Sequence, residues 1–163
     1  TIRYDFSDIR NESSVPLDNF YWRDILPTDA VTLRSISTGT WNEELKYTIY
    51  YKTNLVSEER VLAERLSTGT NNTIDCSASA LKLKAGEVIT EIRFDFGNVQ
   101  PGFEPVTNPY ITCLVHPDLP HEYRFKNCTD VGGERGDEWV IDKDCWVTVI
   151  YAVPKGKLPK TGN

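Results

Sequence analysis

Methionine is absent from the 163-residue chain, and no apolar run approaches the roughly 20 residues that a membrane-spanning helix requires. The N-terminus also lacks the basic start and apolar centre of a secretory signal peptide. Because the chain begins at Thr1 rather than at an initiator methionine, we expect a processed or trimmed product. The sequence therefore predicts neither a membrane span nor a retained targeting peptide.

An excess of positive charge is also missing. Lysine and arginine total 18 against 24 aspartate and glutamate residues, which gives a formal net charge of −6. Nucleic-acid backbones and anionic lipid surfaces select clustered lysine and arginine. We therefore expect no nucleic-acid partner and no membrane contact in the mature form, and we interpret the charge as a source of solubility.

Motifs for nucleophilic catalysis and phosphate binding are missing as well. The sequence contains no Gly-x-Ser-x-Gly element and no glycine-rich phosphate loop. The only histidines, His116 and His121, sit together in a proline-containing loop rather than beside a nucleophile. We therefore predict a non-catalytic protein without a cofactor.

Neither of the two segments rich in ligand-type residues has the spacing of a metal site. Zinc is held by histidine and carboxylate ligands, but Pro117 and Pro120 make the histidine segment a loop and not a shared helix face. The acidic stretch around Gly132–Gly136 lacks the Asp-x-Asp-x-Asp-Gly spacing of a calcium loop. We predict no bound metal, with calcium as the weaker alternative at the carboxylates of Asp130, Glu134, Asp137, Glu138, Asp142 and Asp144.

Four cysteines are present, and none belongs to the Cys-x-x-Cys pair of a zinc knuckle or redox site. Four spaced cysteines in a secreted chain suggest two disulfides, with three possible connectivities. We predict Cys76–Cys113 and Cys128–Cys145, the second bond crossing a glycine-rich hairpin between the last two strands. Each closed loop would add on the order of 3 kcal/mol if oxidised. Free buried thiols are the alternative.

Apolar and polar residues alternate with a period of two over most of the chain, the pattern of half-buried β-strands. Turns rich in glycine and proline separate these segments, and only 57–65 and 78–84 suit a helical turn. Nine or ten short strands predict an all-β fold: an antiparallel immunoglobulin-like β-sandwich over 1–153, followed by a flexible, extended tail over 154–163. The expected strands are 2–7, 45–52, 91–96, 123–126 and 146–151, with shorter ones at 18–25, 31–36, 60–66 and 110–115.

The tetrapeptide Ser-Thr-Gly-Thr occurs twice, at 37–40 and at 67–70. We interpret both copies as hairpin turns in which Gly39 and Gly69 take a positive φ. A match of four residues is too short to predict an internal repeat.

A recognisable pattern occupies the N-terminal segment; its fixed residues are Asn11, Pro16, Leu17, Asp24, Leu26 and Pro27. This order resembles an immunoglobulin-like repeat family of bacterial surface proteins, a domain of unknown function. Residues 125–131 resemble the closing strand of the same family, with Cys128 as a departure. The resemblance implies a fold and a stalk-like role, without an activity. In physical terms Pro16 fixes a kink, and we expect Asp24 to accept backbone N–H bonds at the following turn.

The pentapeptide Leu158-Pro159-Lys160-Thr161-Gly162 matches the sortase motif Leu-Pro-x-Thr-Gly at every fixed position. The resemblance implies that a sortase cysteine attacks the Thr161 carbonyl, forms a thioester and releases Gly162 onward. An amine of the peptidoglycan cross-bridge then leaves an amide on Thr161. Pro159 bends the peptide for the enzyme groove, and Lys160 is the tolerated variable position.

This resemblance predicts a secreted protein on the surface of a Gram-positive bacterium, anchored to the cell wall, with sortase and the cross-bridge as partners. The hydrophobic span and basic residues that follow the motif in this class are absent, as expected of a shortened chain.

A binding role is the alternative to a structural one. Trp41 and Trp139 flank predicted turns and are the candidates for an exposed aromatic surface. The module would then be an adhesin or pilin domain that contacts a host glycan or a matrix protein. Some related wall proteins also carry an intramolecular Lys–Asn amide beside a buried carboxylate, for which the candidate residues are Lys46, Lys52, Lys126 and Asn127.

Overall fold

The computed structural model describes residues 1–152, and residues 153–163 lie outside the described part. The predicted sorting motif Leu158–Gly162 belongs to that last segment. Most of the described chain is β-strand, and it contains no helix long and apolar enough to cross a membrane. The elements are β1 (Ile2–Asp5), β2 (Leu17–Ile25), β3 (Val31–Ser37), β4 (Thr40–Trp41), β5 (Lys46–Thr53), β6 (Arg60–Ser67), β7 (Thr73–Asp75), α1 (Ala78–Leu81), β8 (Ile89–Val99), β9 (Pro105–Thr107), β10 (Tyr110–Val115), β11 (Arg124–Arg135) and β12 (Glu138–Val149).

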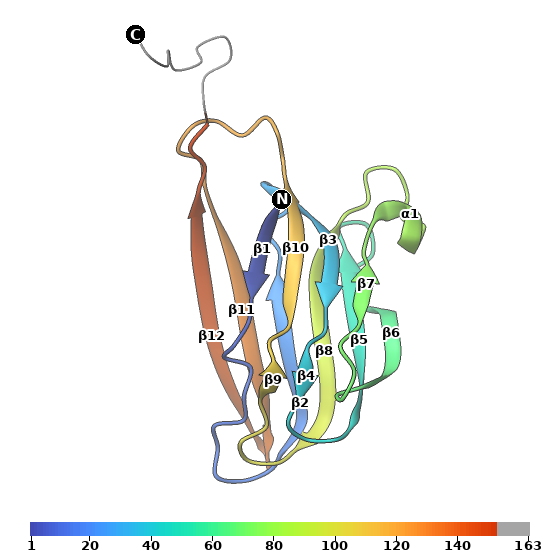
Figure 1. Ribbon diagram of the computed structural model, residues 1–163, viewed down its shortest axis with the longest axis vertical. Helices are drawn as coiled ribbons and strands as arrows, with labels where there is room; N and C mark the ends of the chain where they lie inside the picture. The colour runs from blue at the N-terminus through green and yellow to red at the C-terminus, as the bar shows by residue number, and fades with distance from the viewer. Residues whose placement is uncertain (153–163) are drawn as a thin grey trace.

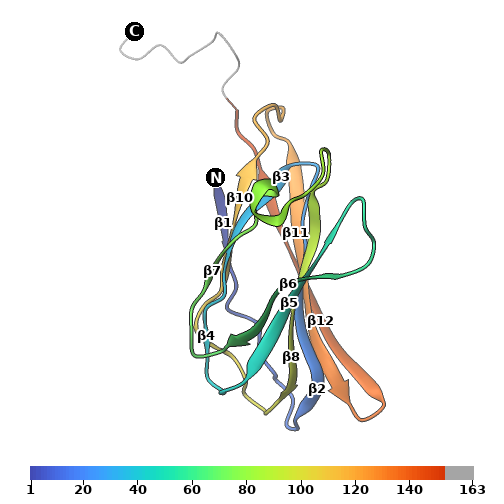
Figure 2. The ribbon, with the colours of Figure 1, turned by 90° about the vertical axis from the view of Figure 1, so that its right-hand side faces the viewer.

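Two antiparallel sheets form the two layers of the molecule (Figures 1 and 2). The smaller sheet has the order β1-β10-β3-β7, and the larger has the order β12-β11-β2-β8-β5-β6. Strands β4 and β9 form a separate short ribbon. Strand pairing is antiparallel throughout these sheets, which confirms the prediction of an antiparallel all-β fold.

One apolar core fills the space between the two sheets. Phe6, which follows β1, packs on Trp22 of β2 with ring centroids 4.6 Å apart. Trp22 in turn meets the edge of Phe94 of β8, with centroids 5.0 Å apart. All three side chains are buried, and burying a large apolar side chain contributes up to about 3 kcal/mol. These rings therefore hold the two layers together.

The sequence alternation predicts the burial within the strands. Tyr47, Ile49 and Tyr51 of β5 are buried, whereas the residues between them are only partly buried. Strand β8 repeats the pattern with Ile92 and Phe94. Successive side chains of a strand point to opposite faces, so one face of each strand lies on the core.

Two local predictions are wrong. Residues 60–67 form strand β6, so the helical alternative for 57–65 does not hold; pairing with β5 overrides the local preference. Gly39 has the expected positive φ of 68°, but Gly69 does not take a positive φ. A helical turn does form at α1, where Ser77 caps the first turn.

The described chain enters and leaves at the same end of the molecule. The hydroxyl of Tyr4 in β1 lies 3.5 Å from the hydroxyl of Thr148 in β12, so the first strand begins beside the end of the last (Figure 1). We call this the terminal end. The β11–β12 turn at Gly136 lies at the opposite end, which we call the hairpin end (Figure 1).

Candidate functional site

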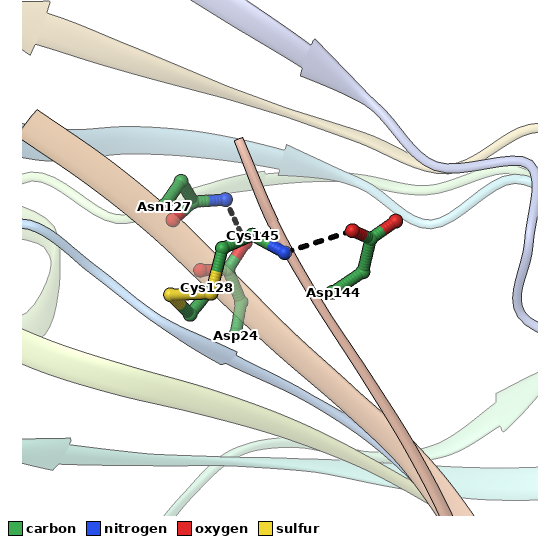
Figure 3. The surroundings of a disulfide bond; sticks show 5 residues. All are labelled: Asp24, Asn127, Cys128, Asp144 and Cys145. Carbon is green, nitrogen blue, oxygen red and sulfur yellow. Dashed lines mark hydrogen bonds between the residues drawn. A yellow bond between two sulfur atoms is a disulfide. The ribbon is translucent and has the colours of Figure 1, made fainter. Parts of the chain in front are cut away.

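A disulfide ties the last two strands together. Cys128 of β11 lies directly opposite Cys145 of β12, with the Cα atoms 4.1 Å apart (Figure 3). The short Cα distance is that of a pair without mutual backbone hydrogen bonds. The backbone N–H of Cys145 instead donates to Oδ1 of Asp144 at 2.9 Å. The structure therefore places this bond across the hairpin that the sequence indicates.

The predicted Cys76–Cys113 disulfide is not formed, and both residues are free buried thiols. Cys113 pairs with Leu33 of β3, and the N–H of Cys76 donates to Arg34 on the same strand. Strand β3 thus separates the two cysteines. Strands two places apart are roughly 9.5 Å from each other, farther than the about 7 Å between Cα atoms that a disulfide can bridge.

Asp24 and Asn127 form a buried polar pair between the sheets. Both residues are 0% exposed, and Nδ2 of Asn127 donates to Oδ2 of Asp24 at 2.9 Å (Figure 3). The other carboxylate oxygen of Asp24 and the single side-chain oxygen of Asn127, both named Oδ1, have no hydrogen-bond partner. Burial raises the pKa of Asp24 to about 7, and the hydrogen bond from Asn127 opposes part of the rise.

Protonation of Asp24 would satisfy both unpaired oxygens at once. A neutral carboxyl group carries one O–H donor, and Oδ1 of Asn127 is an acceptor. Figure 3 draws the two free oxygens on the same side of the existing hydrogen bond. A protonated Asp24 would therefore keep the hydrogen bond from Asn127 and bring an O–H donor to a pair in which two oxygens have no partner.

The expected role of Asp24 at a turn is wrong. Asp24 lies within β2, two residues after the buried Trp22 and on the same face, and its one hydrogen bond goes to a side chain. The signal in the sequence was the alternation of the strand, which places Asp24 on the same buried face as Trp22.

No candidate lysine reaches Asn127 in the described chain. Lys46 and Lys126 are exposed, and the amine of Lys52 lies 3.8 Å from Glu91. Lys126 neighbours Asn127 in β11 and so points to the opposite face of the sheet. The geometry therefore gives a Lys–Asn amide no nucleophile among residues 1–152.

The two candidate aromatic residues have opposite environments. Trp41 is only 5% exposed; its ring stacks on Phe103, and Nε1 donates to the carbonyl of Thr38 at 3.1 Å. The prediction that Trp41 belongs to an exposed surface is therefore wrong, because its ring packs against Phe96 and Phe103 in the core. Trp139 is 51% exposed at the start of β12, near the hairpin end.

Trp139 stands beside a charged cluster on the outer face of the larger sheet. Its ring meets Tyr21 edge-on, with centroids 6.1 Å apart. The hydroxyl of Tyr21 donates to Asp130 at 2.6 Å. The guanidinium of Arg23 donates two hydrogen bonds to the same carboxylate in a bidentate arrangement, at 2.8 and 2.9 Å. Burial, followed by the bond to Asp130, raises the pKa of Tyr21 to about 12. Both carboxylate oxygens of Asp130 therefore already accept hydrogen bonds within the protein. Asp130 is one of the residues named above as possible calcium ligands.

An acidic groove runs between the β1–β2 connection and the inner face of β12. It has a volume of about 290 Å³, and Trp22 and Trp146 contribute to its lining. One lysine, Lys143, also lines it. Its carboxylates are Asp5, Asp8, Glu12, Asp142 and Asp144.

The histidine segment is held by ordinary polar contacts. Nε2 of His116 lies 3.1 Å from the hydroxyl of Thr32, and Nδ1 of His121 accepts the N–H of Ala152 at 3.1 Å. Across residues 1–152, His, Cys, Asp and Glu side chains do not converge in threes to hold a metal ion.

No known family, curated protein or solved structure matches this chain.

Proposed function

We propose that this chain is a non-catalytic module of a Gram-positive surface protein, joined to the cell wall by sortase at Thr161. One observation carries the proposal: the complete motif Leu158–Gly162 follows β12, the last strand of residues 1–152, after a short polar segment of the sequence. A sortase must draw its substrate peptide into a groove, and enzymatic processing of this kind concentrates outside the packed core of a domain.

The strand arrangement supports an immunoglobulin-like interpretation. In immunoglobulin sandwiches the sheets have the orders A-B-E-D and C-F-G. Here β11-β2-β8-β5 and β3-β10-β1 have the same pattern of neighbours. One difference remains. In an immunoglobulin domain the first strand, A, lies beside B and the last strand, G, lies beside F. In the proposed fold the early strand β1 takes the place of G, and the late strand β11 takes the place of A.

The disulfide suits a module that carries tension. A pull on the tail would peel β12 from β11, starting at Val149. After four residues the pull would reach Cys145, where the disulfide passes the load to Cys128. The hairpin beyond that bond would stay out of the path of force. This arrangement favours a stalk-like role near an attachment point.

Ligation by a purified sortase tests the attachment. With triglycine as the amine acceptor, intact-mass analysis should show loss of Gly162-Asn163 and an amide between Thr161 and the acceptor. The Thr161→Ala variant should give no product. The Thr107→Ala variant, which changes an exposed threonine elsewhere, should react like the parent. Equal ligation of the Thr161→Ala protein would refute the proposal.

A binding role is the second candidate, and the position of Trp139 favours it. This half-exposed ring lies at the start of β12, near the hairpin end, whereas β12 ends at the terminal end (Figure 1). A module held by its tail would direct Trp139 away from the wall. Exposed aromatic rings of this kind stack on sugars or anchor protein contacts.

Glycan arrays and immobilised matrix proteins test this second candidate. Saturable binding should weaken at least tenfold in the Trp139→Ala variant. The Tyr151→Ala variant removes a 74% exposed ring at the terminal end and should bind like the parent. Loss of binding in both variants, or in neither, would contradict a site at Trp139.

A further inference from the structure

Three of the four edges of the two main sheets are blunted, and one is not. Strands β1 and β7, at the edges of the smaller sheet, have only four and three residues. Strand β6 pairs with β5 through two register shifts, and its Arg65 has a φ of 55°. Short strands, bulges and twists are the usual protection of an edge against further pairing. By contrast, β12 runs for twelve residues in unbroken register with β11.

The free edge of β12 carries a regular row of unpaired backbone groups. In an antiparallel ladder, alternate residues bond to the same neighbour. Ile150 exchanges bonds with the chain before β11, and Cys145 directs its N–H to Asp144 instead of to β11. The odd-numbered residues of β12 therefore direct their N–H and C=O groups outward; these are Trp139, Ile141, Lys143, Cys145, Val147 and Val149.

The two faces of β12 differ in character. On the outer face, Trp139, Ile141 and Val147 are 51%, 50% and 56% exposed. On the inner face, Asp142 and Asp144 line the acidic groove. A strand that added to this edge would meet mostly apolar side chains, with Lys143 among them, on one face and the carboxylates of Asp142 and Asp144 on the other.

A second copy of the chain is a poor occupant of this edge. Residues that face each other across an antiparallel pair lie on the same face of the sheet. Two β12 strands paired about their centres would place Asp142 and Asp144 of one copy beside the same residues of the other. Like charges in opposed positions are destabilising, and Asp144 also covers the Cys145 N–H at the centre of the edge.

We propose that β12 is a docking edge for an extended segment of a partner in which basic and apolar residues alternate. The segment of about nine residues pairs with the outward groups from Trp139 to Val147. Its lysine or arginine residues face Asp142 and Asp144, and its apolar residues cover Trp139 and Ile141. A cation opposite Asp144 draws that carboxylate away from the Cys145 N–H and completes the ladder, which gives selectivity for a basic strand. This inference does not depend on attachment at Thr161.

Amide hydrogen exchange on the full 163-residue protein tests the docking edge. The probe is a ten-residue synthetic peptide of alternating lysine and valine, at low ionic strength. The outward N–H groups of Trp139, Ile141, Lys143 and Val147 should exchange at least tenfold more slowly when the peptide is bound. A peptide of alternating glutamate and valine should bind at least tenfold more weakly.

Two variants separate edge pairing from general charge attraction. Asp142→Asn/Asp144→Asn should weaken the lysine peptide at least tenfold, whereas Glu58→Gln/Asp118→Asn, which removes the same charge at exposed sites elsewhere, should not. Lys143→Pro removes one outward N–H without removing a bond to β11, and it should also abolish the slow exchange.

Three results would overturn the docking edge. The first is unchanged exchange at the outward N–H groups in the presence of the lysine peptide. The second is equal binding of that peptide by the two charge variants. The third is a concentration-dependent slowing of exchange without any peptide, which would assign the edge to a second copy of the chain.

Discussion

At the scale of single residues, Asp24 has the most unusual environment in the described chain. It lies between the sheets with one hydrogen bond from Asn127 and one unpaired oxygen. A charged carboxylate in such a place would lack most of its hydration, which explains why burial raises its pKa to about 7. The neighbouring thiol of Cys113 does not titrate in this range, because burial raises its pKa to about 12.

This environment makes the free energy of unfolding depend on pH in a definite direction. Below about pH 4 the carboxyl group of Asp24 is protonated in both the folded and the unfolded chain, so its stabilising contribution is complete. As the pH rises toward 7, the unfolded chain loses the proton and the folded protein retains it. The contribution of Asp24 is therefore lost as the pH rises through the folded pKa of about 7.

We expect the free energy of unfolding to fall by roughly 2 to 3 kcal/mol between pH 5 and pH 8 on account of Asp24. The Asp24→Asn variant keeps a neutral side chain that can form both hydrogen bonds with Asn127, so this part of the decrease should disappear. Urea unfolding at both pH values measures the difference, and the other titrating groups are common to both proteins. An identical pH dependence in the two proteins would contradict the assignment.

At the scale of elements, the β11–β12 hairpin combines a covalent bond with a long free edge. The disulfide lies four residues from the end of β12, so it closes a loop that contains the turn and one side of the acidic groove, including Asp142 and Asp144. Sequence spacing indicated this pairing because two strands around a glycine-rich turn must come back side by side. The sequence did not predict that β12 has a free edge, because local residue patterns do not show which strand lies at the edge of a sheet.

Pulling experiments on the hairpin should reveal the closed loop. When the full chain is stretched by its ends, the oxidised protein should unfold to a length about 60 Å shorter than the reduced protein, since 17 residues of extension are withheld. The Cys145→Ser variant should match the reduced protein under both conditions. Single-molecule force spectroscopy measures the difference, and equal lengths with and without reductant would contradict this force path.

At the scale of the whole molecule, the proposed attachment and the proposed binding surface lie at opposite ends. Tyr4 and Thr148 meet at the terminal end, and β12 runs there from the hairpin end (Figure 1). In the proposed attachment, tension enters at Val149 and is diverted at Cys145. Trp139 and the first part of the docking edge lie beyond that point. A single module would thus separate its load-bearing part from its exposed surface.

The sequence by itself determined the features that depend on local pattern. Alternation of period two placed Tyr47, Ile49 and Tyr51 on the buried face of a strand, and it predicted the antiparallel all-β class. The glycine-rich turn predicted which cysteines would face each other at Cys128 and Cys145. These predictions succeed because side-chain direction within a strand, and pairing across one hairpin, are set by neighbours in the chain.

Only the tertiary structure decided the features that depend on which strands become neighbours. Strand β3 lies between Cys76 and Cys113 and keeps them apart, and long-range packing against Phe96 and Phe103 buries Trp41. The meeting of Asp24 with Asn127 joins residues that are far apart in the sequence. Long-range pairing is determined by the packing of the whole core, since each strand has several partners that would satisfy its own alternation.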